Sequence, residues 1–436
     1  MTLHDAEVVG IGEADQDLTT AVSNKELSET LKLKADHLVN RWFLPNFREF
    51  WKREAPLRET VETKFAGKYG RVPDRPEDWE VLLGEFVLEE LNTSPEWIFD
   101  HTGIKERRVA REDIATSDLA ASAAENALAM AGISPQQVDG IFLATVTPDH
   151  LYTPPTTALV AKKLGVAKAD QQGNLRHISY LDCAEACSSF MAAFKTACLH
   201  LMCGVCKTVL VIGADVMTRT ASRFSRNLLP IMGDGAGALV LVACPRNLGS
   251  PNFLPSWFFD FVDGELSDLI ITPAGGSRMP VTAGMINNPL DQRHTMMMNG
   301  PAVRKQAVRL LLPAKGQFKK ALGNVLPKAL EQAGFSMDNL EDFFRALNSN
   351  GLILFHQANG VINADLEERL RREFGYEGKF FGNIAHRANT TSATIPLLLL
   401  DAWRKGVLKA RMMIFATVFG GGFTAASARF KWTLEQ

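Results

Sequence analysis

The sequence predicts an α/β protein with a mixed, largely parallel sheet that helices cover on both faces. Short apolar segments of the kind that form buried strands alternate with longer segments of helical periodicity. The composition, 46% hydrophobic and 22% charged, is ordinary for a globular protein. At 436 residues, the chain is long enough for two domains or for one large duplicated unit.

The first half of the chain shows this alternation most clearly. Residues 7–12 can open the sheet as its first strand. An Ala-rich helix, which Ser117 and Asp118 can cap and which ends near Gly132, precedes a buried-type strand at 140–146. The further elements expected in order are a helix at 156–164, a strand at 178–181, a long apolar helix after Cys187, a strand at 209–212, and a glycine-rich turn at 233–237 that enters another strand.

The segment from about residue 25 to residue 92 has a different character. Its aromatic residues, such as Trp51 and Trp79, are mixed with many charges, and residues 82–88 have helical periodicity. We interpret this segment as an inserted helical layer. Docking of an acidic or phosphorylated partner on its aromatic stripe is the alternative, but such stripes more often pack on the main body of a protein.

A change of composition separates the two halves of the chain. Pro, Asn, Gly and Ser accumulate around residues 245–255, which predicts an N-terminal domain at 1–245 and a C-terminal domain at 246–436. The second half repeats the element order of the first without sequence identity. Its expected elements are a helical region at 307–333, a strand at 351–355, helices at 363–374 and 395–403, and a last strand at 412–418.

The charge and the cysteines exclude several classes of protein. A net charge of −2 argues against a general nucleic-acid or membrane-surface binder. No apolar stretch approaches the roughly 18 residues that span a bilayer. Six cysteines lie in the middle of the chain and no basic residues precede an apolar N-terminal run, so we expect a reduced, cytoplasmic protein. Cys203 and Cys206 have the spacing of a zinc pair, but no second pair completes a site, and we expect no metal.

Cys187 is the candidate nucleophile. It stands between an apolar strand and an apolar helix in which Phe190, Phe194 and Leu201 recur at helical spacing. A thiol at the first turn of a helix faces unpaired backbone N–H groups and the positive end of the helix dipole, which favour the thiolate and lower its pKa. The alternative is a small core residue, because free cysteine is among the most buried residue types.

His356 and Asn389 are polar residues at the borders of apolar segments in the second half. His356 directly follows the strand at 351–355, at the sheet edge where α/β folds place their sites, and can serve Cys187 as a base or hydrogen-bond donor. Asn389 opens a polar turn that runs into a helix, and it is the third candidate. The alternatives are a structural histidine and an ordinary helix cap.

Three glycines at 420–422 follow the last predicted strand. They permit close approach of the backbone to a bound group, and an N–H group there could form an oxyanion hole with that of Cys187. A phosphate-binding loop is less expected, because no Lys-Ser or Lys-Thr follows these glycines.

Six motifs, in this order, resemble those of the β-ketoacyl-acyl-carrier-protein synthase III family of the thiolase superfamily. Any one motif is weak, whereas all six in order are specific. The similarity covers about residues 5–22, 93–245 and 290–436. The motifs lie at residues 96–108, 186–188, 233–237, 356–359, 389–392 and 419–424.

The resemblance implies a homodimer with a thiolase-like five-layered αβαβα fold and duplicated halves. It also implies an acyltransferase without a cofactor, in fatty-acid-like, polyketide or other specialised lipid synthesis. Cys187 would take an acyl group from acyl-CoA or an acyl carrier protein. That acyl group would be joined to a malonyl or β-ketoacyl thioester. His356 and Asn389 would bind the malonyl-type thioester and stabilise the enolate left by its decarboxylation. The amides of Cys187 and Gly421 would form the oxyanion hole. The implied substrate-binding residues are Trp97, His101, Pro154, Asn359 and Phe423.

The sequence departs from the family pattern at several positions. His101 stands where the family often has an Arg after Trp97, which predicts a weaker grip on coenzyme A, and residues 360–361 lack the usual Leu-Arg. Pro154 stands where relatives that join two long acyl chains carry a Glu, which argues against a non-decarboxylative route. Glu185 is a substitute candidate for that base, although a structural hydrogen bond is the more ordinary role.

Three other functions remain open on the sequence. The acyl group on Cys187 could pass to an alcohol or amine, or the chain could be a cysteine hydrolase with the same Cys, His, Asn order. The flanks of Cys187 lack the pattern of papain-like hydrolases. The third is a non-catalytic partner subunit, for which three intact candidate residues are unexpected.

Overall fold

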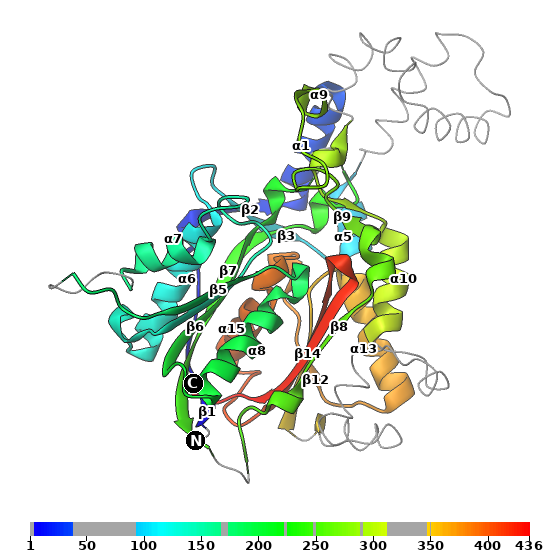
Figure 1. Cartoon of the computed structure of the whole chain (residues 1–436). Coiled ribbons are helices and arrows are strands. Elements are labelled where there is room, and N and C mark those ends of the chain that lie inside the picture. Colours follow the sequence, from blue (N-terminus) through cyan, green and yellow to red (C-terminus); the bar gives the residue numbers. More distant parts are fainter. Residues whose placement is uncertain are drawn as a thin grey trace, which may run out of the picture.

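Two large sheets and the helices packed around them form most of the structure (Figure 1), which is a computed structural model. Each sheet has five strands among the residues that the structure describes. The described residues are 4–37, 93–166, 173–221, 225–246, 250–287, 291–311, 347–348 and 350–436.

The first sheet has the strand order β1-β7-β6-β4-β5. Strand β4 pairs in parallel with β5 and β6, whereas β7 is antiparallel to both β6 and β1. The strands are β1 (His4–Glu13), β4 (Gly140–Ala144), β5 (Ser179–Cys183), β6 (Thr208–Val216) and β7 (Asp234–Pro245).

The second sheet repeats this topology. Its order is β12-β11-β13-β14-β8. If the five strands of each sheet are numbered 1 to 5 along the chain, both sheets have the spatial order 3-2-4-5-1. The directions match too, because β11 is parallel to β12 and β13, and β14 is antiparallel to β13 and β8. The strands are β8 (Phe258–Val262), β11 (Gly351–Phe355), β12 (Lys379–Phe380), β13 (Met413–Gly420) and β14 (Thr424–Lys431).

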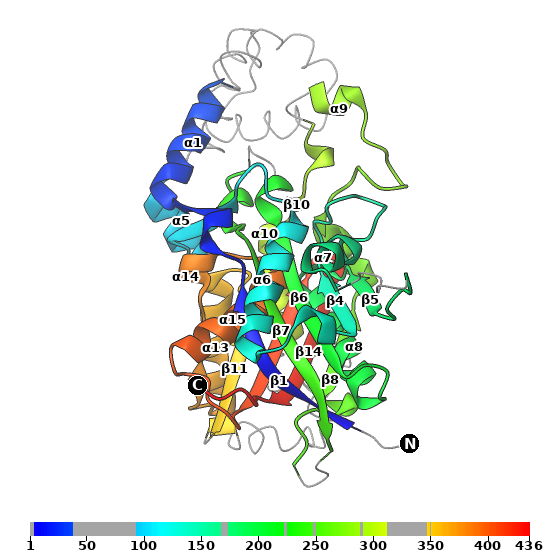
Figure 2. The ribbon, with the colours of Figure 1, turned by 90° about the vertical axis from the view of Figure 1, so that its left-hand side faces the viewer.

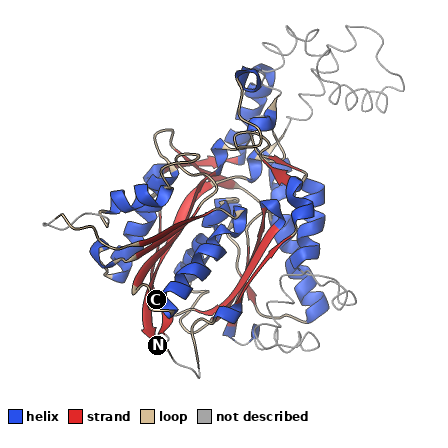
Figure 3. Ribbon diagram, viewed as in Figure 1, coloured by secondary structure: helices blue, strands red, loops and turns tan. Residues whose placement is uncertain are grey.

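The helices and sheets form five layers, αβαβα, as Figure 3 shows. One pair of helices covers the outer face of the first sheet, a second pair lies between the sheets, and a third pair covers the outer face of the second sheet. These pairs are α6 (Thr116–Ala131) with α7 (Thr156–Leu164), α8 (Ser189–Met202) with α15 (Thr394–Arg404), and α10 (Gly300–Leu311) with α13 (Gly360–Phe374).

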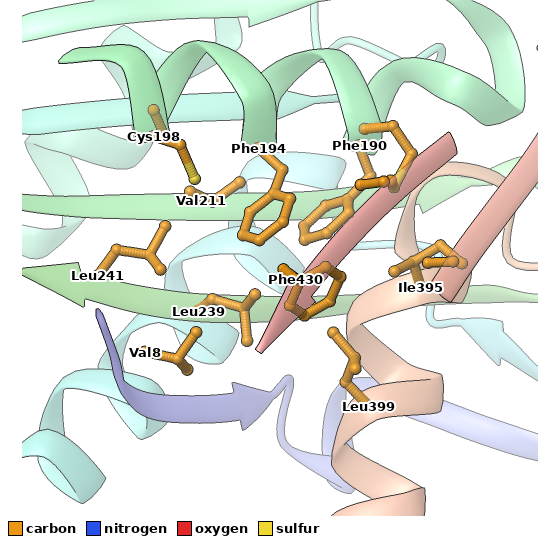
Figure 4. Packing of buried hydrophobic residues seen from close by; sticks show 14 of the residues in the cluster. Val8, Phe190, Phe194, Cys198, Val211, Leu239, Leu241, Ile395, Leu399 and Phe430 are labelled. Carbon is orange, nitrogen blue, oxygen red and sulfur yellow. The ribbon is translucent and has the colours of Figure 1, made fainter. Parts of the chain in front are cut away.

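The central layer is apolar because its helices meet a sheet on each side (Figure 4). Phe190 and Phe194 of α8 stack with their ring centroids 6.0 Å apart, and Phe194 meets Phe430 of β14 edge-on at 5.1 Å. Ile395 of α15 belongs to the same cluster. Burying a Phe side chain contributes about 1.5–3 kcal/mol, so this cluster holds the N-terminus of α8 firmly in place.

The smaller elements lie mainly at the end of the molecule that carries α1 and α9, at the top of Figure 1. Figure 2 shows the same end from the side. They are α1 (Asn24–His37), β2 (Thr19–Ser23), α5 (Pro95–Thr102), β3 (Glu106–Ala110), β9 (Ile270–Ile271), α9 (Ala283–Asn287), β10 (Met297–Met298) and α14 (Ile384–Arg387).

The α/β prediction and the duplicated halves are confirmed, and three local expectations were wrong. Strand β5 is not buried but forms the edge of its sheet, where Tyr180 is 65% exposed. The glycines at 233–237 lie mostly within β7 rather than in a turn. Their role is to let α15 pack closely on the strand, since a Cβ on Gly237 would lie 2.9 Å from Pro396. The strand at 412–418 is not the last, since β14 follows it.

Two expectations lie largely beyond what the structure describes. Helix α1 covers the beginning of the predicted insertion at 25–92, whereas residues 38–92 are outside the described residues, as is most of the helical region expected at 307–333. The domain boundary after residue 245 stays a prediction.

Candidate active site

Cys187 lies in the short turn that connects β5 to α8. A 3-10 helix at Ala186–Ser188 leads directly into α8, and β5 ends four residues before Cys187. Ala186 has a φ of 50°, in the left-handed region that costs a non-glycine residue energy. This turn places the thiol at the carboxyl edge of the parallel strands, the usual position of an α/β site.

His356 directly follows β11. Its backbone N–H donates to the carbonyl oxygen of Thr417 at 2.9 Å, and its ring meets that of Phe419 edge-on at 6.0 Å. Gln357 fixes the turn, because its Nε2 donates to Phe355 and its Oε1 accepts from the N–H groups of residues 383 and 384. Those residues begin α14, so Gln357 ties the His356 turn to the segment that leads to Asn389.

Asn389 lies between α14 and a 3-10 helix at Thr391–Ala393 that leads into α15. Its backbone N–H donates to the oxygen of Ile231 at 2.9 Å. Its side-chain Oδ1 accepts from the N–H of Thr391 at 2.9 Å. This bond fixes the plane of the carboxamide, and leaves the Nδ2 group as the end of the side chain that can donate to a ligand.

One cavity of about 1080 Å³ joins these three residues. Cys187, His356 and Asn389 all line it, although they come from three separate turns of the chain. Most of the rest of its wall is apolar, and includes Val146, Met217, Leu228, Ile231, Met232 and Met298. A large apolar cavity with a few convergent polar groups is the usual form of a small-molecule site.

Gly420 and Gly421 bring the end of β13 against the Cys187 turn. A Cβ on Gly420 would lie 2.5 Å from the backbone nitrogen of Cys187, so no side chain fits there. Gly421 lines the cavity, and a Cβ at that position would lie 3.5 Å from Ala186. The backbone of the glycine run therefore forms part of the wall next to Cys187.

Burial controls the charge of Cys187. The protein around the thiol raises its pKa to about 12, and the nearby carboxylate of Asp215 adds to this effect, while the backbone amide of Cys187 and the side chain of Thr391 act in the opposite direction. The expectation of a lowered pKa was therefore wrong, because desolvation outweighs the amides at the helix N-terminus. The thiol is neutral at neutral pH.

His356 is also neutral at neutral pH, because burial lowers its pKa to about 3. Its side chain is 1% exposed, and neither ring nitrogen has a hydrogen-bond partner among the described residues. A neutral imidazole has one donor and one acceptor nitrogen. Both functions are consequently available to a molecule in the cavity.

An aromatic group marks the rim of the cavity. The ring of Trp97 on α5 stacks on that of His101 at 4.3 Å, and the guanidinium of Arg226 lies 4.9 Å from the Trp97 ring. Asn359 also lines the cavity, where its Oδ1 caps α13 by accepting from Val361 and its Nδ2 donates to the His101 oxygen. Arg226 could not be predicted from the sequence, because it lies far along the chain from Trp97.

Three other residues named from the sequence lie outside the cavity wall. Phe423 is 2% exposed and packs in the core beside the second sheet, because the turn after the glycines directs it inward. Pro154 is exposed on the loop between β4 and α7, and Glu185 is exposed and close to Lys195 and Asp260. Glu185 therefore faces away from the space that Cys187 shares with His356.

No group of three His, Cys, Asp or Glu side chains in the described part of the chain is arranged to hold a metal ion. None of the described helices combines the length and apolar character that crossing a bilayer requires.

Sequence and structure comparisons agree on one family. The family model of 3-oxoacyl-[acyl-carrier-protein] synthase III matches residues 181–255, and the model of its C-terminal part matches residues 348–432. The β-ketoacyl-[acyl-carrier-protein] synthase III of Caldanaerobacter subterraneus subsp. tengcongensis is 33% identical over 355 residues, which are 81% of this chain and 95% of that protein. The one from Desulfitobacterium hafniense Y51 is 32% identical over 375 residues, 86% of this chain and 98% of that protein.

Solved structures have the same fold. The crystal structure of 3-oxoacyl-[acyl-carrier-protein] synthase III from Aquifex aeolicus VF5 matches with a TM-score of 0.63 and 25% identity, covering 98% of this chain and 100% of that chain. The extent of the match, together with the cavity that joins a cysteine, a histidine and an asparagine, shows that this chain belongs to the β-ketoacyl-[acyl-carrier-protein] synthase III family of condensing enzymes.

Proposed function

We propose that the chain joins an acyl group carried on Cys187 to a malonyl thioester by a decarboxylative Claisen-type condensation. One observation carries the proposal: a thiol, a neutral imidazole and a carboxamide line a single apolar cavity. The relatives are β-ketoacyl-[acyl-carrier-protein] synthases, a name that describes a reaction of this class. The pathway we propose is fatty-acid-like, polyketide or other specialised lipid synthesis.

In the first step, the sulfur of Cys187 attacks the carbonyl carbon of an acyl thioester. Because burial keeps the thiol protonated, its proton has to leave as the new bond forms. Neutral His356 in the same cavity is the proposed acceptor, and it returns the proton to the departing thiolate. The backbone N–H groups of Cys187 and Gly421 are the proposed oxyanion hole for the tetrahedral intermediate.

In the second step, His356 and Asn389 act as hydrogen-bond donors. The N–H of the neutral imidazole and the Nδ2 of Asn389 hold the thioester oxygen of the malonyl group, which becomes the enolate oxygen when carbon dioxide leaves. The enolate carbon then attacks the acyl carbon on Cys187, Cys187 leaves as a thiolate, and a proton from solvent restores the thiol. A preorganised donor of this kind is worth about 3–4 kcal/mol of transition-state stabilisation.

The donors of the acyl group are proposed to be acyl-CoA or an acyl carrier protein, with no metal or other cofactor. Trp97 and Arg226 at the rim offer a flat aromatic face and a cation to such a carrier, and His101 and Asn359 lie beside them. The chemistry requires only the thiol and hydrogen-bond donors of the chain itself.

We propose a homodimer that forms along β5. This edge strand exposes Tyr180 and Leu181, and the loop that carries Pro154 exposes Leu151 and Tyr152 to 72% and 77%. An exposed apolar edge strand is a ready site for pairing with a second copy.

We propose a cytoplasmic location, which fits six cysteines that are all free. We propose no nucleic-acid partner, which fits the net charge of −2.

Intact-protein mass spectrometry tests the nucleophile. The protein is incubated with a panel of acyl-CoA and acyl carrier protein thioesters, and we expect a mass increase of one acyl group. Cys187→Ala should abolish it, whereas Cys203→Ala, which removes an exposed cysteine outside the cavity, should load as the unmodified protein does. Loading of Cys187→Ala would disprove the assignment.

Product analysis tests the condensation. His356→Ala should still load the acyl group but should release little carbon dioxide and form little β-ketoacyl product from a malonyl thioester. Normal product formation by this variant would remove His356 from the mechanism. Ester or amide formation with an alcohol or amine, without release of carbon dioxide, would instead support the acyl-transfer alternative.

A further inference from the structure

Asp215 is a buried carboxylate at the end of β6 for which the reaction described above has no use. It is 0% exposed. Its Oδ1 accepts four hydrogen bonds from the loop after β4: from Thr145 Oγ1 at 3.0 Å, Val146 N at 2.8 Å, Thr147 N at 3.1 Å and Thr147 Oγ1 at 2.9 Å. Its Oδ2 accepts from Ser392 N at 2.9 Å.

These five partners all donate, which is the arrangement that an ionised carboxylate accepts. No Arg or Lys of the described ranges forms an ion pair with Asp215. An unpaired buried charge is costly unless hydrogen bonds compensate it. An apolar residue of the same size would stabilise the fold as well as this carboxylate or better. Stability alone therefore does not explain why an aspartate occupies this position.

The bond to Ser392 ties Asp215 to the turn that carries Asn389. Ser392 follows Thr391, whose N–H holds the Oδ1 of Asn389. On the same strand as Asp215, a Cβ on Gly213 would overlap the backbone oxygen of Ser392, so β6 and this turn are in direct backbone contact. Asp215 thus fixes the turn from one side while Ile231 holds the Asn389 backbone from the other.

We propose that Asp215 is a positioning residue of the condensation step, which clamps the turn at Asn389–Ser392 so that the Asn389 carboxamide faces the cavity beside Cys187. The inference rests on the proposed function. Asp215 touches no reacting atom, and acts through the turn that it holds. It differs in this from His356 and Asn389, whose side chains line the cavity.

The charge of Asp215 also reaches the thiol. It is the second cause, after burial, of the raised pKa of Cys187. His356 is the other titratable side chain beside Cys187 in the cavity, and it stays neutral because its pKa is about 3. The remaining titratable residues of the wall are Asp100, His101, Arg226 and Arg304. Removing the Asp215 charge should thus lower the pKa of the thiol.

Asp215→Asn tests the proposal, because it keeps the size of the side chain. The amide oxygen can still accept from the loop after β4, but the NH₂ group then faces the Ser392 N–H, and two donors cannot bond. We expect acyl loading on Cys187 to persist, and the rate of condensation by loaded enzyme to fall about 10- to 100-fold, since small misplacements cost this much. The pH profile of Cys187 alkylation by iodoacetamide should move to lower pH.

Asp234→Asn is the matched control. Asp234 is 1% exposed and accepts from Thr218 N, Thr218 Oγ1 and Ala110 N, none of which belongs to the Asn389 turn. We expect it to leave the alkylation profile in place. Wild-type condensation by loaded Asp215→Asn, or an equal fall and no alkylation shift in both variants, would overturn the proposal.

A second variant covers a failure of Asp215→Asn to fold. Thr147→Val removes one of the donors to Oδ1 and keeps the charge, so condensation by loaded enzyme should fall several-fold without a shift of the alkylation profile. An unchanged rate would overturn the proposal. Failure of the proposed function gives a different result, because the unmodified protein itself would then neither load an acyl group nor condense, while the alkylation shift in Asp215→Asn would persist.

Discussion

The contact between Gly420 and the Cys187 turn gives the sharpest prediction. Gly420 has φ −154° and ψ −176°, an extended conformation that alanine also adopts, so Gly420→Ala introduces no backbone strain. Its only effect is steric. The new methyl group would lie 2.5 Å from the nitrogen of Cys187 and 3.1 Å from the Cβ atoms of Ala186 and Cys187.

The structure sets the size of the effect. Real Cβ atoms essentially never approach another atom within 3.0 Å, so β13 and the Cys187 turn have to separate by about 0.5 Å. Neither side is a flexible side chain that can move aside. Overpacking of this kind costs about 1–3 kcal/mol of folding free energy. A displacement of the nucleophile by about 1 Å reduces the reaction rate by up to about 10²-fold, and a smaller displacement reduces it less.

Two assays check this prediction with one control. Gly420→Ala should unfold at a temperature a few degrees lower and load acyl groups onto Cys187 about 10- to 100-fold more slowly. Gly235→Ala is the control, because its methyl group would lie 3.4 Å from a Leu397 side chain, which is ordinary contact. Loading by Gly420→Ala at the rate of Gly235→Ala would show that the close approach does not set the nucleophile.

Three further predictions concern charge and capping. Burial lowers the pKa of His356 from 6.5 to about 3, so between these pH values the unfolded chain binds a proton that the folded chain does not. The free energy of unfolding should therefore fall as the pH drops from 6.5 toward 3. His356→Gln should remove that part of the fall, as measured by unfolding curves in acid. Asn359→Ala, which removes a helix cap and the bond to His101, should lower the free energy of unfolding in urea by about 1 kcal/mol. Glu185→Gln should leave loading and condensation rates unchanged, because Glu185 is outside the cavity; a tenfold loss would restore it as a candidate base.

The sequence was sufficient for the elements and for the candidate residues at their ends. The strand at 351–355 is present with the predicted bounds, and the helix at 156–164 likewise. Both have strong local signals, an all-apolar run in one and helical periodicity with a final glycine in the other. The position of His356 followed from the first of these bounds, because it comes directly after the strand.

The remaining features depend on contacts between distant segments. The segment predicted as a strand at 178–181 does not indicate that β5 is an edge strand, because strand order is set by which segments pair. The raised pKa of Cys187 needs the wall around it, and the local helix end alone predicts the opposite direction. Asp215 stands in an ordinary strand sequence, and its five donors come from two loops far away in the chain.

The duplication accounts for how the two halves build one site, and it yields a last prediction. Cys187 and Asn389 occupy equivalent turns before the central helices α8 and α15, and each turn touches the fourth strand of the opposite half: β13 at Gly420 and β6 at Gly213. A methyl group at Gly213 would overlap the oxygen of Ser392, so Gly213→Ala should displace the Asn389 turn and spare Cys187. We therefore expect Gly213→Ala to load acyl groups and fail to condense, whereas Gly420→Ala loads them about 10- to 100-fold more slowly. Equal losses of loading in both variants, measured by intact mass, would contradict this division of the site between the halves.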